Sequence, residues 1–137
     1  MILADTSAWV EYDRATGSAV HRRVRELIAE GGPLAVTEPI MMEVLAGARD
    51  NLREAALRRL LLSFELLRFD VMADFDGATA IYRTCRTAGI TPRGMVDCMI
   101  AAVARRTGAS LLARDSDMNR IAGVVGIHLD VASIDAS

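Results

Sequence analysis

The sequence of 137 residues contains no lysine, so arginine supplies all 16 of its basic side chains. The absence of lysine excludes every mechanism that requires an amine side chain. With 18 acidic residues the formal net charge is −2. The chain is therefore not a polycation, and its long-range attraction for nucleic acid is weak.

Cysteine is also scarce, because Cys85 and Cys98 are too few for a disulfide framework. Cys98 follows Asp97 in an apolar helical run, so we interpret it as a small buried hydrophobic residue and not as a nucleophile. No apolar run approaches the roughly 20 residues that span a bilayer. The first residues lack the basic segment and long apolar stretch of a signal peptide. We expect a cytoplasmic protein without membrane association.

Hydrophobic residues make up 52% of the chain, whose length fits a single domain spanning residues 1–137. Short apolar runs alternate with helical stretches, which predicts an α/β fold. We expect strands at residues 1–4, 34–36, 66–69 and 110–113, and a last strand at 127–131. We expect helices at residues 18–30, 39–47, 50–62, 74–88, 92–107 and 117–122, and a short helical segment at 8–13.

Two acidic residues, Asp5 and Asp115, directly follow predicted strands. Strands that alternate with helices imply a parallel sheet, in which ligands bind beyond the carboxyl ends of the strands. Both carboxylates are therefore expected at that edge of the sheet. Either residue could instead only cap the following helix. Asp117 has the same two possible roles. One of Asp115 and Asp117 would cap the following helix, and the other would be free to join a site.

Asp97 is the most informative acid, because every other side chain in residues 95–104 is apolar. Removing a lone carboxylate from water costs several kcal/mol unless a cation, strong donors or the mouth of a cleft compensates. We favour a functional role for Asp97. The structural alternative is an ion pair with Arg93, one turn earlier. Glu43 lies in a similar apolar run, residues 40–47, where facing a site and facing solvent are equally good interpretations.

Four carboxylates from four separate elements would then meet: Asp5, Glu43, Asp97 and Asp115. Two like charges about 4 Å apart repel by roughly 4 kcal/mol at an effective dielectric of 20. The cluster must therefore bind protons or a cation. Oxygen ligands favour Mg²⁺ or Mn²⁺ over zinc, and neither histidine lies in ligand-like surroundings.

Four segments, in this order and spacing, resemble the PIN-domain family and especially the VapC toxins of VapBC toxin–antitoxin pairs. They are residues 3–9 (LADTSAW), 43–47 (EVLAG), 97–102 (DCMIAA) and 111–117 (LLARDSD). The resemblance implies a PIN-like three-layer α/β/α fold with a central, mostly parallel sheet of four to five strands. It also implies a Mg²⁺- or Mn²⁺-dependent endoribonuclease. The catalytic and metal-binding residues would be Asp5, Glu43, Asp97 and Asp115, with Thr6 or Ser7 as an auxiliary hydroxyl.

Two positions depart from the family pattern. Ala113 stands where the family usually carries Thr or Ser, and Met118 replaces a frequent Phe. Both lie beside Asp115 and Asp117, so the choice between these two acids stays open, with Asp117 kept as an auxiliary residue. The resemblance further implies a cognate VapB-type antitoxin that blocks the site, and a homodimer. The apolar helices expected at 39–47 and 50–62 would form these contacts or pack in the core.

The mechanism we expect is in-line attack of a metal-oriented water on phosphorus, with stabilisation of the departing 3′ oxygen. The three aspartates of the quartet would be mainly ligands. Glu43 would bind metal, orient the water or accept its proton. Arg93 and Arg114 are candidate contacts for the phosphates of the RNA substrate, with solvated or ion-paired surface roles as the alternative.

Other acidic sites on α/β sheets fit less well. A haloacid-dehalogenase-type phosphatase needs a second Asp where this chain has Ser7, and a response-regulator receiver needs a lysine. A non-catalytic RNA- or protein-binding module on the same fold is the alternative from a different class. The retention of all four acids disfavours that alternative, because a cluster without metal only destabilises the fold.

Overall fold

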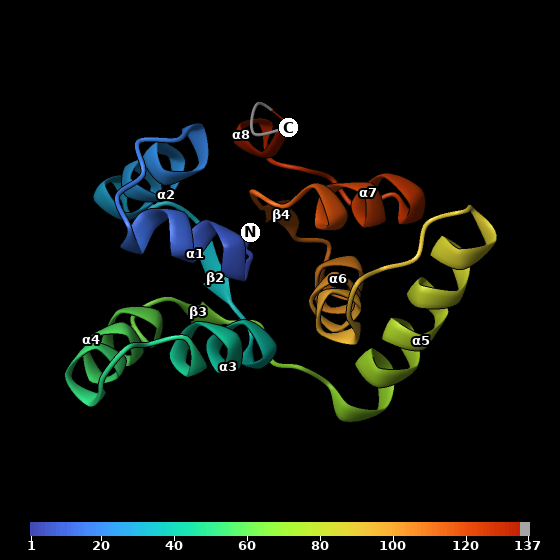
Figure 1. Ribbon diagram of the computed structural model, residues 1–137, viewed down its shortest axis with the longest axis horizontal. Coiled ribbons are helices and arrows are strands. Elements are labelled where there is room, and N and C mark those ends of the chain that lie inside the picture. The colour runs from blue at the N-terminus through green and yellow to red at the C-terminus, as the bar shows by residue number, and fades with distance from the viewer. Residues whose placement is uncertain (135–137) are drawn as a thin grey trace.

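The computed structural model describes residues 1–134, in which four parallel strands lie between layers of helices (Figure 1). The strands are β1 (Ile2–Ala4), β2 (Leu34–Val36), β3 (Glu65–Leu66) and β4 (Ser110–Leu112), in the order β3-β2-β1-β4. Leu3 of β1 pairs with Ala35 of β2 on one side and with Leu111 of β4 on the other. The three residues are fully buried, as expected for central parallel strands.

Helices cover both faces of the sheet: α1 and α2 lie on one side, and α5, α6 and α7 lie on the other (Figure 1). Their bounds are α1 Thr6–Asp13, α2 Ala19–Glu30, α3 Glu38–Ala46, α4 Asn51–Leu61, α5 Val71–Thr87, α6 Met95–Thr107, α7 Ser116–Val125 and α8 Val131–Ile134. The predicted α/β/α class and parallel sheet are thereby confirmed.

Local capping residues set most helix boundaries. The side chains of Ser18, Asp50 and Asp70 accept hydrogen bonds from the first-turn amides of α2, α4 and α5. Gly31 and Gly108 end α2 and α6 in the left-handed conformation, with φ of 64° and 73°. These short-range signals explain why the helix positions could be predicted closely from sequence.

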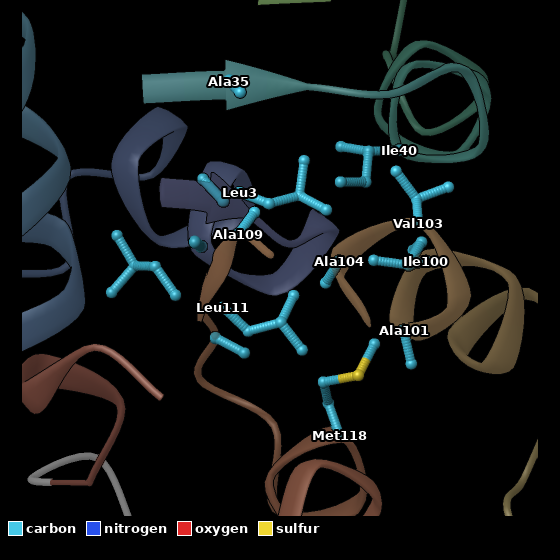
Figure 2. Packing of buried hydrophobic residues seen from close by; sticks show 14 of the residues in the cluster. Leu3, Ala35, Ile40, Ile100, Ala101, Val103, Ala104, Ala109, Leu111 and Met118 are labelled. Atoms are coloured by element: carbon cyan, nitrogen blue, oxygen red, sulfur yellow. The ribbon is translucent and has the colours of Figure 1, made fainter. Parts of the chain in front are cut away.

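The core between the sheet and α6 is built mainly from aliphatic side chains (Figure 2). Leu3 and Leu111 of the strands, Ile100 and Val103 of α6, and Met118 of α7 are all fully buried there. Burying one such side chain contributes about 1.5–3 kcal/mol. The apolar run of α6 therefore anchors this helix against the sheet, and this packing determines where its first turn, with Asp97, lies.

A buried ion pair joins α6 to α5. Asp74 is 1% exposed, and Arg106 donates to its two carboxylate oxygens from Nε at 2.9 Å and Nη2 at 2.8 Å. Arg106 Nη2 also donates to the carbonyl oxygen of Arg68 at 2.8 Å. Despite the burial of Asp74, the hydrogen bonds from Arg106 hold the pKa of this carboxyl below its ordinary value. The pair fixes the C-terminal end of α6 to the segment that enters α5.

The predicted strand at 127–131 is wrong. Leu129 forms only an isolated bridge to Leu111, and α8 begins at Val131. The extended run stops because the Asp130 side chain accepts the amide of Ala132 at 3.1 Å, which starts a turn.

Other element boundaries also differ from expectation, those of β3, α5 and α6 among them. β3 comprises Glu65–Leu66, because the chain leaves the ladder where the amide of Phe69 donates to the Glu38 carboxylate at 2.7 Å. Helix α5 begins at Val71, capped by Asp70, rather than at Asp74. Helix α6 begins at Met95 rather than Pro92.

No helix within residues 1–134 is long and apolar enough to cross a bilayer.

Candidate active site

The N-termini of three helices meet the carboxyl edge of the sheet. Asp5, directly after β1, caps α1, and Asp115, shortly after β4, caps α7. Asp97 lies in the first turn of α6. The partial positive charge of a helix N-terminus favours nearby carboxylates. The sheet and the helix starts therefore position these three acids together.

Asp5 is almost completely buried, with 2% of its surface exposed. Its Oδ2 accepts hydrogen bonds from Ser7 Oγ at 2.8 Å and from the Ser7 amide at 3.4 Å. Its Oδ1 is buried and has no hydrogen-bond partner within the described residues. Burial raises the pKa of Asp5 to about 6, against the lowering effect of the Ser7 bonds and with a further rise from the charge of Asp115.

Asp97 has no hydrogen bond or ion pair from its side chain within residues 1–134. Burial raises its pKa to about 7, and the charges of Asp5, Asp115, Glu43 and Asp117 add to the rise. The structure thus brings Asp5, Glu43, Asp115 and Asp117 within electrostatic reach of Asp97. The alternative ion pair between Asp97 and Arg93 does not form.

Hydroxyl groups from the start of α1 hold parts of the cluster in place. Thr6 Oγ1 donates to Glu43 Oε1 at 2.6 Å and so connects α1 to α3. Ser7 Oγ donates to Asp5 and accepts the backbone amide of Arg114 at 2.9 Å. Thr6 and Ser7 therefore orient carboxylates of the cluster, and their auxiliary role in catalysis stays a prediction.

The two acids whose roles could not be separated from sequence are placed differently. Asp115 Oδ1 accepts the amide of Asp117 at 2.8 Å and so caps α7. Asp117 is buried and accepts the backbone amide of Arg93 at 3.1 Å. The negative charge of Asp115 raises the pKa of both Asp5 and Asp97. The charge of Asp117 raises the pKa of Asp97. Asp115 is thus both a cap and a neighbour of the cluster, two roles that had been treated as alternatives.

Both candidate arginines are ion-paired. Arg93 Nη2 donates to Asp115 Oδ1 at 2.9 Å, and its Nε lies 3.8 Å from Asp117 Oδ2. Arg114 forms an ion pair with Glu11 of α1. Glu11 was not singled out from sequence, because a lone acid on a short helix carries no distinguishing signal.

A groove of about 570 Å³ runs between α1, α3 and α4, and Glu43 contributes to its wall. Apolar side chains and three arginines line it together: Trp9, Val10, Val44, Leu57, Arg14, Arg49 and Arg53, with Asp13, Gly47 and Ala48. Because the groove reaches a member of the acidic cluster, an extended ligand lying in it would meet the site.

The donors of the cluster suit a hard divalent cation. All are carboxylate or hydroxyl oxygens, and the unpartnered oxygen of Asp5 and the raised pKa of Asp97 show that these two acids lack a compensating charge. Within residues 1–134 no three acidic, histidine or cysteine side chains already form a metal-binding arrangement. Small side-chain movements at Asp5, Glu43, Asp97 and Asp115 would therefore accompany binding.

The thiol of Cys98 is unsuited to nucleophilic catalysis, as expected. It is fully buried, and burial raises its pKa to about 11, with smaller contributions from Cys85, Asp97 and Asp117. A thiol with this pKa stays protonated at neutral pH, and the protonated form is a poor nucleophile.

In the absence of metal, the free energy of unfolding should fall by about 4 kcal/mol between pH 5 and pH 8. Asp5 and Asp97 have folded-state pKa values of about 6 and about 7, above the ordinary 3.8, so the folded chain keeps protons that the unfolded chain releases. This stabilisation is complete below about pH 4 and is lost as the pH rises through the folded values. Urea unfolding in EDTA measures it, and constant or rising stability would contradict the carboxylate environments described.

Comparisons with known proteins identify the family that the chain resembles. The profile of the PIN domain family matches residues 2–124. A VapC ribonuclease of Mycobacterium bovis and ribonuclease VapC11 of Mycobacterium tuberculosis are each 47% identical over 129 residues, which cover 93% of this chain and 96% of the relative.

Solved structures share the fold at lower identity. VapBC2 from Rickettsia felis, bound to a DNA fragment from its promoter, matches with a TM-score of 0.74 and 16% identity, over 95% of this chain and 98% of that chain. VapC20 of Mycobacterium tuberculosis, a sarcin–ricin-loop-cleaving toxin, matches with a TM-score of 0.67 and 21% identity, over 93% and 99%. The chain therefore belongs to the PIN domain family and, within it, to the VapC type.

Proposed function

We propose that this chain is a metal-dependent endoribonuclease that acts as the toxin of a type II toxin–antitoxin pair. The observation that carries the proposal is the carboxylate cluster, in which, within residues 1–134, the Asp97 side chain has no partner and a buried oxygen of Asp5 is unpaired. Such a cluster costs stability unless a cation binds to it. RNA as the substrate is supported by the ribonuclease relatives at 47% identity.

The residues proposed to hold the ion are Asp5, Asp97 and Asp115, with Glu43 as a further ligand. We propose Mg²⁺ or Mn²⁺, because the donors are all oxygen atoms. When bound, such an ion supplies a more acidic water and stabilises charge on the departing 3′ oxygen. Asp5 and Asp97 would lose their protons on binding, since only the ionised carboxylates are ligands.

The remaining residues of the site position these groups. Ser7 fixes Asp5 through its hydroxyl, and Thr6 fixes Glu43. Glu43 alone among the four acids also lines the groove, so it is the acid best placed to orient a water beside the substrate or to accept its proton. Asp117 is proposed as an auxiliary residue that anchors the loop before α6 through its bond to the Arg93 amide.

RNA is proposed to enter along the groove between α1, α3 and α4. Arginine side chains there offer planar donors for phosphate, and the apolar lining offers surface for bases. Arg93 and Arg114 are the proposed phosphate contacts beside the acids. Both would first have to leave carboxylate partners, Asp115 and Glu11.

The proposed protein partner is a VapB-type antitoxin, supported by the likeness to VapBC complexes. Met42 of α3 and Leu52 of α4 are large exposed apolar side chains, and Leu62 just after α4 is a third. We propose this surface for the antitoxin or for a second copy of the chain in a homodimer. We place the protein in the cytoplasm, where its RNA substrate would be found.

Chelation tests the proposed activity directly. Purified protein should cleave RNA in Mg²⁺ or Mn²⁺, lose the activity in excess EDTA and regain it when the ion is restored. The reason is that the carboxylates alone offer no activated water. Cleavage that persists in EDTA would contradict the mechanism. RNA binding without cleavage under any ion would instead favour a non-catalytic binding module.

A further inference from the structure

Arg93 lies just before α6 at the edge of the acidic cluster, and its side chain can move without undoing the loop. The side chain is 71% exposed and reaches Asp115 Oδ1 at 2.9 Å. Its backbone amide independently donates to Asp117 Oδ2 at 3.1 Å. The loop therefore remains tied to α7 by the backbone when the guanidinium leaves its carboxylate.

The acids of the site fall into two groups. Asp115 and Asp117 have arginine partners, whereas Asp5, Glu43 and Asp97 have no ion-paired cation within residues 1–134. A divalent ion shared by both groups would reach Asp115, the carboxylate that Arg93 already holds. Two cations on one carboxylate repel each other, so the divalent ion would weaken the ion pair between Arg93 and Asp115.

Once released from Asp115, the guanidinium of Arg93 can bind a phosphate group. Its planar donors match a phosphate group in the same bidentate way as a carboxylate. Arg93 would be freed at the mouth of the site, where the backbone of a bound RNA would lie close to the metal. The Arg93 side chain would then leave Asp115 when metal binds and bind a phosphate when RNA binds.

We propose that Arg93 exchanges partners: it neutralises Asp115 when metal is absent, and metal binding releases it to hold a phosphate of the RNA. The inference rests on the proposed function, because it takes the acidic cluster to be the metal site. The exchange couples metal binding to RNA binding. Because this linkage is reciprocal, metal and RNA should each strengthen the binding of the other.

The first test is the affinity for Mn²⁺ alone, measured by titration calorimetry at pH 8. Arg93→Ala should bind Mn²⁺ about fivefold more tightly than wild type, because a competing ion pair of about 1 kcal/mol is removed. Arg120→Ala is the matched control. Arg120 lies 3.7 Å from Asp117 Oδ1 and makes no bond to Asp115, so its removal should change the affinity by less than about twofold.

The second test measures phosphate contacts with a fluorescent 20-nucleotide oligodeoxythymidylate, whose integrity is checked on a denaturing gel. Each lost contact to a single strand lowers the slope of log affinity against log salt by about 0.7. In Mn²⁺ the slope for Arg93→Ala should be lower than the wild-type slope by this amount. In EDTA the two slopes should agree, because Arg93 is held by Asp115.

Three results would overturn the exchange. They are equal Mn²⁺ affinity in wild type and Arg93→Ala, a slope difference that is the same in EDTA and Mn²⁺, and an Arg120→Ala effect as large as that of Arg93→Ala. A wild-type protein that binds no Mn²⁺ would refute the proposed function itself. Failure of the exchange alone would show as normal Mn²⁺ binding that is insensitive to Arg93.

Discussion

Asp97→Asn is expected to reduce RNA cleavage by about 1000-fold while making the metal-free protein more stable. The loss corresponds to about 4 kcal/mol, the scale of the charge stabilisation that a catalytic metal supplies. The gain in stability follows because the Asp97 side chain has no bonding partner among residues 1–134 and is repelled by Asp5, Asp115 and Glu43. Single-turnover cleavage and urea unfolding in EDTA measure the two effects.

The gain should depend on pH in a defined direction. At pH 5 Asp97 is largely protonated, so asparagine should change stability little, and at pH 8 the variant should be more stable by about 2–3 kcal/mol. Asp76→Asn, an exposed position on α5, is the matched control and should leave cleavage and stability unchanged. Full activity in Asp97→Asn would remove this residue from the site, and a clear loss of metal-free stability would show that its role is structural.

Arg106→Met should lower the free energy of unfolding by about 2–3 kcal/mol, the largest effect we expect from a residue outside the site. It leaves the buried Asp74 carboxylate with the Asp70 amide, at 2.8 Å, as its remaining donor. Removing one partner of a buried pair costs about 3–5 kcal/mol, and the 38% exposure of the Arg106 side chain reduces that figure. Denaturant unfolding at neutral pH measures the change.

The neighbouring arginine provides the control for this experiment. Arg105→Met removes the same charge from the same turn of α6, but Arg105 is exposed and should change stability by less than about 0.5 kcal/mol. Adding Asp74→Asn to Arg106→Met should recover part of the loss, because a neutral amide is less costly to bury than a carboxylate. Equal effects of the two arginine substitutions would contradict a specific role for the buried pair.

Elements whose formation depends on nearby residues were predicted closely. Gly31 and Gly108 end helices within their own turns, and Asp50 caps α4 through the amide of Arg53 at 2.7 Å. The predicted strand at 127–131 is wrong because a local turn at Asp130 competes with pairing to Leu111, which is distant in sequence. Only one bridge to Leu111 forms before the side chain of Asp130 starts α8.

In the candidate site, too, features set by nearby residues could be predicted from sequence, and contacts between distant residues could not. Asp97 could be identified from sequence because an acid among apolar helical residues requires a reason, whatever the fold around it. The partners of Arg93 could not be identified in this way. The sequence separation suggested Asp97, one turn away, whereas Arg93 binds Asp115, 22 residues further on.

For the acidic quartet, the sequence by itself determined which carboxylates lie where strands end or where apolar helices begin, because burial and capping follow from short-range patterns. Only the tertiary structure decided how those acids share their charges. It placed Asp115 both at the cap of α7 and beside Asp5 and Asp97, and it assigned Arg93 to one half of the cluster. The physical reason is that ion pairs and pKa values depend on distances between side chains, which the chain sets only when the helices pack on the sheet.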